Sequence, residues 1–281
     1  MNEQQLSTPI GRRTFWRRSA AALGAGLLSG QARAENVAEA DFEFLAFNDP
    51  HFQDLEHCPA WFEKLFAAMR ASAPRAAFAL LAGDLTQDAS AAEFEGLKKL
   101  FPLLKAPVLV TPGNHDVNAA GLDNYSQAFP NTLNYATEQC GWQVIGLDST
   151  DGEASEKTRI KPETLAWLDA HLPQLDARKP TILFTHFPLG AGLQYRPAKA
   201  GDVLKRFAKF NLQAVFCGHF HGYSETLFNN AALTTGRCCA RSRGNHDGSP
   251  LKGWFVCSAQ KGRIARRFVA APVELLATAH T

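Results

Sequence analysis

The stretch Val108-Leu109-Val110-Thr111-Pro112-Gly113-Asn114-His115-Asp116 joins a short apolar run to a polar tetrapeptide. Such a run is typical of a strand that is covered on both faces. The Asn, His and Asp side chains that follow it are oxygen and nitrogen donors suited to divalent metals. In open α/β sheets, sites form beyond the carboxyl ends of strands. This stretch therefore predicts a buried strand of an α/β sheet with a metal-binding turn at its end.

Four other polar segments follow apolar runs in the same way. They are Asp49-Pro50-His51, Gly83-Asp84, His186 and Gly218-His219-Phe220-His221. The expected strands are Phe42–Phe47, Phe78–Leu81, Val108–Val110, Thr181–Phe184 and Ala214–Phe216. The seven candidate metal ligands are Asp49, His51, Asp84, Asn114, His186, His219 and His221. That number is too large for one ion and suits two divalent ions, with Mn, Fe and Zn as the candidates.

The spacing of these residues suggests how they reach a shared site. Alternate residues of an extended segment face the same side, so Asp49 and His51 are expected to share one metal. The same reasoning lets His219 and His221 point into one cleft. Glycines that allow sharp backbone turns before the ligands are expected at Gly83, Gly113 and Gly218.

The tetrapeptide of the opening stretch occurs a second time, as Gly244-Asn245-His246-Asp247. It follows Arg241-Ser242-Arg243 rather than an apolar strand, and it falls outside the order of the other segments. Any one of these motifs alone is weak evidence, because Gly-Asp and a lone His are usually structural. We therefore predict a loop here and count His246 only among the candidate substrate-binding residues.

Amphipathic segments alternate with the expected strands, and this repetition predicts βαβ units of an α/β fold. Helices are expected at Trp61–Arg70, Ala91–Leu104 and Pro162–Leu172, where apolar residues recur at helical spacing. Leu133–Asp148 has the pattern of a hairpin, and Tyr223–Val269 that of several antiparallel strands. A mixed sheet, or two packed mixed sheets with helices outside, fits these patterns best.

The first 34 residues have the three parts of a twin-arginine export signal. Arg12-Arg13-Thr14-Phe15-Trp16-Arg17-Arg18 is basic, an Ala/Gly/Leu-rich stretch follows, and Ala32-Arg33-Ala34 has the form of a cleavage site. A disordered basic tail is the alternative interpretation. We predict that residues 1–34 are a signal peptide and that residues 35–281 form one domain. The protein is then expected in the periplasm or outside the cell, delivered by the Tat export machinery.

Charge and composition exclude several classes of protein once residues 1–34 are set apart. The chain carries a net charge of +2, and five arginines against one glutamate in residues 1–34 leave −2 for the rest. This balance gives no reason to expect binding to nucleic acid or to an anionic membrane. No apolar run after residue 34 is long enough to span a bilayer. Export would permit disulfides among the six cysteines, whose pairing stays open, and Cys217 is expected to be a buried thiol.

The five segments together closely resemble the motifs of the calcineurin-like metallophosphoesterase family, which are D-x-H, GD, GNH(D/E), H and GHxH. The resemblance covers nearly the whole chain after residue 34 and points to a bacterial, exported, cyclic-nucleotide phosphodiesterase-like branch. It implies a four-layer α/β/β/α fold, in which two packed mixed sheets are flanked by helices.

The resemblance also implies two metal sites that share Asp84. One would be formed by Asp49, His51 and His221, and the other by Asn114, His186 and His219. His115 corresponds to the histidine that contacts the substrate phosphate and protonates the leaving group.

Two departures narrow the class that the resemblance implies. Gln87 stands where purple acid phosphatases carry a ligand tyrosine, which argues against an Fe(III)–tyrosinate site. Gly83–Ala89 lacks the G-D-x-x-D-R-G motif of the Ser/Thr protein phosphatases of this superfamily. The carboxylate that orients His115 is then either Asp88 or Asp116, and Asp116 joins His115 as a candidate catalytic residue.

These observations predict a metal-dependent hydrolase of small-molecule phosphate esters, in which metal-bound hydroxide attacks phosphorus. Phosphodiesters are slightly preferred, and a phosphomonoesterase that scavenges phosphate is the alternative. A non-catalytic metal-binding protein is a weaker alternative, because every position of the motifs is filled. A metallo-β-lactamase is set aside because its H-x-H-x-D-H cluster is absent. Candidate phosphate-binding residues are Arg237, Arg241 and Arg243, for which a solvated basic loop is the favoured alternative.

Overall fold

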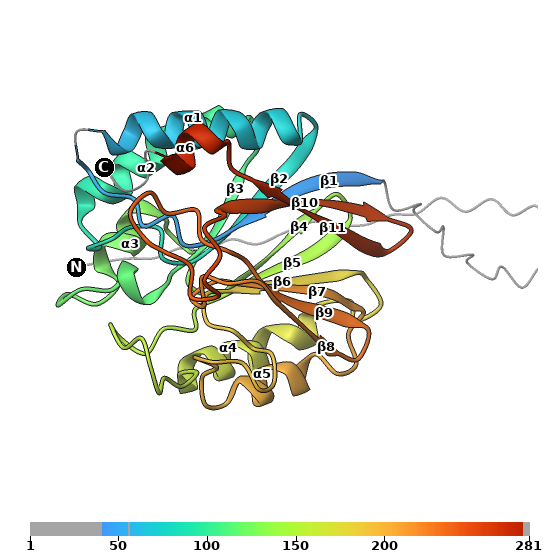
Figure 1. Ribbon diagram of the computed structural model, residues 1–281. Coiled ribbons are helices and arrows are strands. Elements are labelled where there is room, and N and C mark those ends of the chain that lie inside the picture. Colours follow the sequence, from blue (N-terminus) through green and yellow to red (C-terminus); the bar gives the residue numbers. More distant parts are fainter. Residues whose placement is uncertain (1–40, 56, 278–281) are drawn as a thin grey trace, which may run out of the picture. The chain divides into compact units, whose positions relative to one another are not determined.

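The computed structural model of the chain describes residues 41–55 and 57–277 (Figure 1). The predicted signal peptide, residues 1–34, lies outside the described residues, as do residues 35–40 at the start of the predicted domain. Within the described residues, the strands β1 to β11 form two sheets. The α-helices are α1 (Cys58–Ser72), α2 (Ala91–Leu100), α3 (Asp123–Ala128), α4 (Pro162–His171), α5 (Ala200–Arg206) and α6 (Val273–Ala277).

One sheet combines the first three strands with the last two, in the order β11-β10-β1-β2-β3. Its strands are β1 (Phe42–Phe47), β2 (Ala76–Ala82), β3 (Val108–Thr111), β10 (Gly253–Gln260) and β11 (Arg263–Ala270). The pairs β1–β2 and β2–β3 are parallel, whereas β1–β10 and β10–β11 are antiparallel. The three parallel strands confirm the first three strands expected from the apolar runs.

The other sheet has the order β4-β5-β6-β7-β9-β8. Its strands are β4 (Tyr135–Gln139), β5 (Trp142–Leu147), β6 (Thr181–Thr185), β7 (Leu212–Cys217), β8 (Ser224–Phe228) and β9 (Ala231–Thr235). The predicted hairpin is confirmed as the antiparallel pair β4–β5. The neighbours from β5 to β9 are parallel, and β8 closes one edge antiparallel to β9.

The antiparallel strands predicted for Tyr223–Val269 are confirmed as the pairs β8–β9 and β10–β11, but the prediction misses the parallel pairing of β9. This segment is divided between the sheets, because β8 and β9 join β7 while β10 and β11 join β1. In addition, β9 pairs parallel to β7. The physical reason is burial: every residue of β9 is buried against its neighbours, whereas β8 exposes alternate residues and forms the edge. Residue alternation predicts the β8–β9 hairpin but not which of its strands docks on β7.

Three apolar clusters separate four layers (Figure 1). Neighbouring residues of β1 face opposite sides of the sheet, so Phe44 packs between the two sheets and Leu45 packs under the outer helices. Between the sheets, the rings of Phe44 and Phe216 meet edge to face with centroids 5.8 Å apart. Helices α1, α2, α3 and α6 contribute to the outer cluster of the first sheet, and α4 and α5 to that of the second. This arrangement confirms two packed mixed sheets flanked by helices.

The three predicted helices are confirmed, but several of their ends differ: α1 is Cys58–Ser72 rather than Trp61–Arg70, and α4 ends at His171 rather than Leu172. The α-helix predicted for Ala91–Leu104 stops at Leu100 and continues as a 3₁₀ turn over Phe101–Leu104. Pro102 lies in this turn and has no N–H for an α-helical hydrogen bond, which accounts for the change. Among the described residues no helix is both long and apolar enough to cross a membrane.

All six cysteines lie in the described residues and are free thiols. Cys217 is buried at the end of β7, as expected, and burial raises the pKa of its thiol to about 12.

Candidate metal centre

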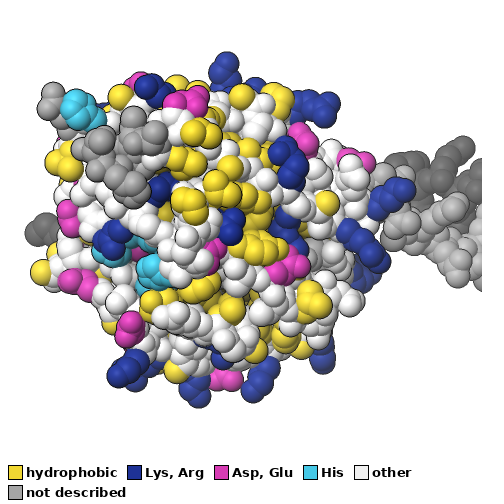
Figure 2. All heavy atoms as spheres, in the orientation of Figure 1, with side chains coloured by type: hydrophobic (Ala, Val, Ile, Leu, Met, Phe, Trp, Pro, Cys, Tyr) yellow, Lys and Arg dark blue, Asp and Glu magenta, His cyan; other side chains and the backbone are white. Residues whose placement is uncertain are grey.

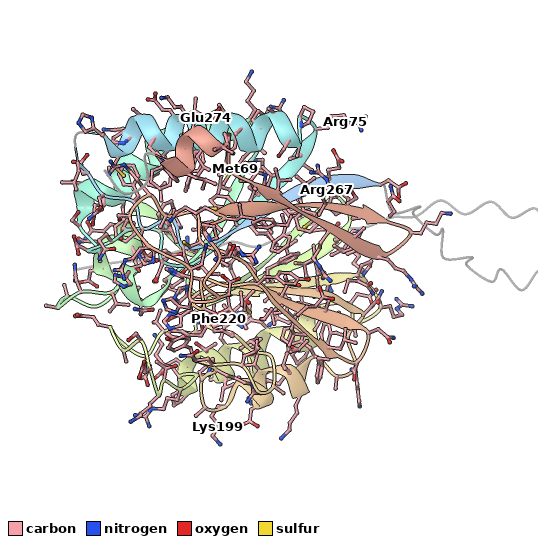
Figure 3. All side chains as sticks on the ribbon, in the orientation of Figure 1. Met69, Arg75, Lys199, Phe220, Arg267 and Glu274 are labelled. Carbon is pink, nitrogen blue, oxygen red and sulfur yellow. The ribbon has the colours of Figure 1, made fainter. Side chains whose placement is uncertain are left out.

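The candidate metal ligands meet where the carboxyl ends of the parallel strands of both sheets come together. The first sheet supplies residues after β1, β2 and β3, and the second supplies residues after β6 and β7. Phe220, labelled in Figure 3, lies between the two histidines of the loop that follows β7. Figure 2 shows histidine side chains reaching the surface beside Lys or Arg side chains, left of the centre of this face. The common edge rule for α/β sheets thus places all seven candidates in one region.

A first group consists of Asp49, His51, Asp84 and His221, all buried, with ligand atoms within 4.8 Å of one another. His51 Nε2 lies 3.1 Å from His221 Nε2 and 3.5 Å from Asp84 Oδ2. His221 Nε2 lies 3.2 Å from Asp49 Oδ1. Two carboxylates and two imidazoles facing one point are a donor set suited to a divalent metal.

A second group shares Asp84 and adds His186 and His219. His186 Nε2 is 3.3 Å from Asp84 Oδ1, 3.0 Å from His219 Nδ1 and 3.1 Å from the amide oxygen of Asn114. The two oxygens of Asp84 therefore face different groups, Oδ2 the first and Oδ1 the second. A carboxylate in this position is able to bridge two cations.

The outward nitrogens of the histidines show how the inward nitrogens are protonated. His186 Nδ1 faces the carbonyl of Ala82 at 3.2 Å, and His219 Nε2 faces the carbonyl of Ser155 at 2.8 Å. A carbonyl only accepts hydrogen bonds, so each of these nitrogens carries the proton. Burial lowers the pKa of both imidazoles, to about 3 for His219. Both rings are therefore neutral and direct a lone pair into the second group, as metal-binding histidines do.

In the first group, the pKa of His221 is shifted in the opposite direction. Burial lowers the pKa of His221, but the Asp49 carboxylate outweighs burial and the pKa lies well above its usual value. A metal would take the place of this proton. His51 faces the same group through Nε2, whereas its buried Nδ1 on the other side of the ring has no hydrogen-bond partner among the described residues. The residues present fit two divalent cations.

The pKa values of the Asp49 and Asp84 carboxyl groups are shifted in opposite directions by their neighbours. Burial raises the pKa of Asp49, but the nearby His221 and His186 outweigh it and the pKa lies below its usual value. Burial and the charge of Asp49 raise the pKa of Asp84 to about 7. The backbone N–H of His219 donates to Asp49 Oδ2 at 3.0 Å, and Asn48 Nδ2 donates to the same oxygen at 2.5 Å.

The expectation that Asp49 and His51 lie on an extended segment is wrong. Their φ angles are 51° and 46°, in the left-handed region, and those of His219 and His221 are 64° and 44°. Asp84 also has a positive φ, of 49°. Such backbone is unfavourable for non-glycine residues and persists where surrounding contacts determine it, often at functional sites. The ligands therefore converge through tight turns rather than through strand alternation.

Only one of the three glycines acts as predicted. Gly83 has a φ of +78°, which allows the turn into Asp84. Gly113 has extended backbone instead, with φ −115° and ψ −178°. A Cβ at Gly113 would lie 2.2 Å from Asp84 Oδ1, and one at Gly218 would lie 2.6 Å from Asp49 Oδ2. These two positions require glycine because the carboxylates of two candidate ligands, Asp84 and Asp49, approach them closely.

His115 is oriented by neither of the two carboxylates considered for it. Its Nδ1 lies 2.8 Å from the backbone carbonyl of Gln87, so Nδ1 donates and Nε2 carries the lone pair. Asp116 instead accepts four hydrogen bonds, from the backbone N–H groups of Leu85, Thr86 and Gly113 and from the Thr86 hydroxyl. Asp116 is fully buried and holds the turn that carries Asp84, so the structure gives it a positioning role. Asp88 is exposed.

The structure brings two of the four candidate substrate-binding residues to the centre. Arg243 Nη2 lies 3.2 Å from His115 Nε2, and the His246 ring packs on the His221 ring with centroids 5.3 Å apart. Arg237 pairs with Asp247 at 3.0 Å and lies over the Phe268 ring. Arg241 lines a separate hollow with Trp61 and Lys64.

Sequence reasoning missed two backbone carbonyls that orient metal-facing histidines. Ser155 accepts from His219, and Gly244 O lies 3.1 Å from His221 Nδ1. Both carbonyls belong to loops that follow parallel strands, β5 and β9, at the same edge as the ligands. The edge rule that located the ligands would have found these loops had β9 been recognised as parallel.

A cleft of about 520 Å³ adjoins the second group and leads to solvent. Its wall includes Asn114 and His115 from the first tetrapeptide and Ser155 from the loop after β5. A small molecule in this cleft would lie against both a candidate metal ligand and the candidate proton donor.

A family model described as calcineurin-like phosphoesterase matches residues 42–223. The chain belongs to the calcineurin-like phosphoesterase family. The matched range contains all seven candidate ligands together with His115, and it ends before the loop that carries Arg243.

Curated relatives of this calcineurin-like phosphoesterase include two named phosphodiesterases. The probable glycerophosphodiester phosphodiesterase GpdQ of Arcobacter nitrofigilis is 27% identical over 175 residues, 58% of this chain and 63% of the relative. The 3',5'-cyclic adenosine monophosphate phosphodiesterase CpdA of Escherichia coli K12 is 31% identical over 163 residues, 54% of this chain and 56% of the relative. The chain thus spans less than two thirds of the length of these relatives.

Solved structures share the fold at low sequence identity. A dimetal phosphatase from Danio rerio has a TM-score of 0.63 and 12% identity, with 82% of this chain and 96% of that chain covered. The purple acid phosphatase PPD1 from yellow lupin has a TM-score of 0.62 and 12% identity, with 83% and 52% covered. These likenesses confirm the fold of two sheets flanked by helices.

Proposed function

We propose that this calcineurin-like phosphoesterase hydrolyses small-molecule phosphate esters with two divalent cations, Mn, Fe or Zn, and slightly prefers phosphodiesters. The observation that carries the proposal is the convergence of carboxylate oxygens and imidazole nitrogens on two adjoining points that share Asp84. Two cations bound there would clamp phosphate oxygens and lower the pKa of a water enough for attack near neutral pH.

The residues around this centre have separable tasks. The Asp84 carboxylate sets the spacing of the two groups, and Asp116 fixes the turn on which Asp84 lies. His115 lines the cleft, and its Nδ1 donates to the Gln87 carbonyl, so Nε2 is the nitrogen that would face the leaving oxygen. Without substrate this Nε2 accepts from Arg243 Nη2, so it would protonate the leaving oxygen only after gaining a proton itself. Ser155 and Gly244 hold the rings of His219 and His221 in place through their carbonyls.

The preference for diesters is supported by the names of the relatives, which are a glycerophosphodiesterase and a cyclic-nucleotide phosphodiesterase. A phosphomonoesterase is the second candidate, favoured by the cation that Arg243 places beside His115.

Hydrolysis of bis-p-nitrophenyl phosphate and of p-nitrophenyl phosphate by the Mn²⁺-loaded chain tests the proposal. We expect turnover of both, with the diester preferred, and loss of turnover in Asp84→Asn. Arg178→Gln is a matched control, because Arg178 is exposed and pairs with Asp176 on the surface. No turnover of either substrate by protein that holds two metal ions would refute the proposal.

We also propose that residues 1–34 direct export through the twin-arginine route to the periplasm or beyond. The paired Arg12 and Arg13 in the basic block support this proposal. Replacement of both by lysine is expected to leave the protein inside the cell, which fractionation of a bacterial host would detect. Unchanged export of this variant would contradict the proposal.

A further inference from the structure

Arg243 reaches the centre from a loop that lies beyond the family match. Its Nε and Nη2 donate to the side-chain oxygen of Gln87 at 3.1 and 2.9 Å, and Nη2 also lies 3.2 Å from His115 Nε2. Because His115 Nδ1 carries its proton toward the Gln87 carbonyl, Nε2 accepts from Arg243. Among the described residues Nη1 has no hydrogen-bond partner, so the guanidinium keeps free donor capacity at the centre.

The loop that carries Arg243 is fixed by several hydrogen bonds. Lys252, a buried lysine, donates to the Arg243 carbonyl. Asn245 accepts from the Cys238 N–H at 3.0 Å and donates to the carbonyls of Ser249 and Leu251, both at 2.8 Å. A cation held by a fixed loop loses little conformational freedom when it binds an anion.

Arg243 also lies close to the first ligand group, because its Nη2 is 3.2 Å from His115 Nε2. The rings of His51 and His115 are 4.7 Å apart, so Arg243 and His115 together border the first ligand group. An anionic group bound at the centre therefore lies within the field of this guanidinium.

We propose that Arg243, positioned by Gln87, binds an anionic phosphoryl oxygen on the His115 side of the centre and thereby sets the ratio of monoester to diester hydrolysis. This inference rests on the proposed phosphoesterase function. A phosphomonoester has three non-bridging oxygens and up to two negative charges, whereas a phosphodiester has two such oxygens and one charge. If bound cations held two of these oxygens, only the monoester would present a further anionic oxygen to Arg243.

The free energy of one charge-assisted hydrogen bond in a partly buried site is large enough to change the ratio of monoester to diester hydrolysis. Loss of the guanidinium in Arg243→Gln is expected to lower kcat/KM for p-nitrophenyl phosphate by roughly 10- to 100-fold. For bis-p-nitrophenyl phosphate the expected loss is only about two- to threefold, because its third oxygen is esterified. Arg243→Lys keeps the positive charge but loses the planar set of guanidinium donors. This variant should retain more monoester activity than Arg243→Gln.

The control for this substitution is Arg241→Gln, which removes the same charge from the same loop. Arg241 faces a hollow lined by Trp61 and Lys64, away from His115, so this variant is expected to keep the wild-type ratio. Gln87→Ala removes the acceptor of Arg243 and keeps the carbonyl that orients His115. It should shift the ratio in the same direction as Arg243→Gln, by less.

Binding of inorganic phosphate to the metal-loaded proteins gives a readout that does not depend on turnover. Calorimetry should show roughly 10-fold weaker binding or more in Arg243→Gln, and unchanged binding in Arg241→Gln, with equal metal contents. Equal losses on the two ester substrates, or unchanged phosphate binding in Arg243→Gln, would overturn the inference. If wild type turned over neither ester, the proposed function would fail, while phosphate binding would still decide whether Arg243 holds phosphate.

Discussion

The chain contains the tetrapeptide Gly-Asn-His-Asp twice, and the two copies do different things. In the first, Asn114 faces His186 in the second ligand group and the N–H of His115 donates to Asp84 at 2.8 Å. In the second, Asn245 bonds within its own loop, and Gly244 supplies only a carbonyl to His221. The first copy directly follows β3, whereas the second belongs to the loop between β9 and β10. Position relative to a parallel strand, rather than the letters, thus decides which copy supplies a ligand.

The largest difference between the two copies is expected for the rate of hydrolysis after substitution of their histidines, His115 and His246. His115→Ala removes the candidate proton donor and is expected to slow hydrolysis of esters with poor leaving groups by about 10²- to 10⁴-fold. The loss should shrink for p-nitrophenyl esters, whose leaving group needs little protonation. His246→Ala removes only a ring that packs on His221, and a loss of a few-fold is expected. Steady-state kinetics over a series of leaving groups would measure both; similar losses would make the two copies equivalent.

The aspartates of the two copies, Asp116 and Asp247, differ in how much they contribute to the stability of the fold. Both oxygens of Asp116 accept from buried donors, so Asp116→Asn places an amide N–H₂ against N–H groups. At pH 8 we expect the free energy of unfolding to fall by about 2–4 kcal/mol. Asp247 lies in an exposed loop, and Asp247→Asn should cost less than about 1 kcal/mol. Urea denaturation measures both variants. A loss for Asp247→Asn as large as that for Asp116→Asn would contradict this distinction.

The asparagines differ in whether they support metal binding. Asn114→Ala removes an oxygen from the second ligand group, and affinity for one of the two cations is expected to fall about 100-fold. Asn245→Ala loosens the second loop and should leave two ions bound per chain. Metal analysis after dialysis against a weak chelator distinguishes the two results. Full retention of metal by Asn114→Ala would remove this residue from the ligand set.

The glycines differ in the space around them. A Cβ at Gly113 would lie 2.2 Å from Asp84 Oδ1 and 2.3 Å from the Asp84 backbone nitrogen, whereas nothing lies within 4 Å of one at Gly244. Gly113→Ala should therefore destabilise the fold by roughly 1–3 kcal/mol and displace Asp84. Gly244→Ala is expected to be neutral or slightly stabilising. Thermal unfolding with and without metal would show a reduced metal response in the first variant only.

The pKa values of Asp116 and Asp247 should be shifted in opposite directions in the metal-free protein. Burial and then Asp84 raise the pKa of Asp116 to about 7. Burial raises the pKa of Asp247 as well, but hydrogen bonds from Ser249 and Tyr223 outweigh it and the pKa is lowered. The stability linked to Asp116 is thus present below its unfolded pKa near 4 and lost as pH rises through 7. That linked to Asp247 is present above pH 4 and lost only as pH falls through its folded pKa. Carboxyl NMR would show both; joint titration near pH 4 would contradict the assignment.

Much of the centre was predictable because its ligands obey two local rules. Apolar runs mark the strands, and polar residues just beyond them mark the edge where sites form. The positive φ angles of Asp49 and His221 were not predictable, because they depend on contacts between segments distant in sequence. For example, the Asp49 N–H donates to the Gly83 carbonyl at 3.1 Å.

The parts that sequence reasoning missed depend on long-range docking. The pairing of β9 with β7 follows from burial across a sheet, and residue alternation does not show it. The role of Arg243 follows from the meeting of its loop with Gln87, which is 156 residues away along the chain. The difference between Arg243 and its near neighbour Arg241 is likewise a matter of which way a folded loop turns each side chain.

The division of the ligands between two sheets sets the order in which the centre is completed during synthesis. Asp49 and Asn114 emerge early, whereas His221 emerges more than a hundred residues later. The sheet that carries Asp49 also needs β10, which ends at Gln260, beside β1. An unfinished chain that stops before β7 therefore lacks His219 and His221, and it lacks Ala214 and Phe216 of the packing between the sheets. The full set of candidate ligands is thus present only once β7 and the loop after it have been made, late in synthesis.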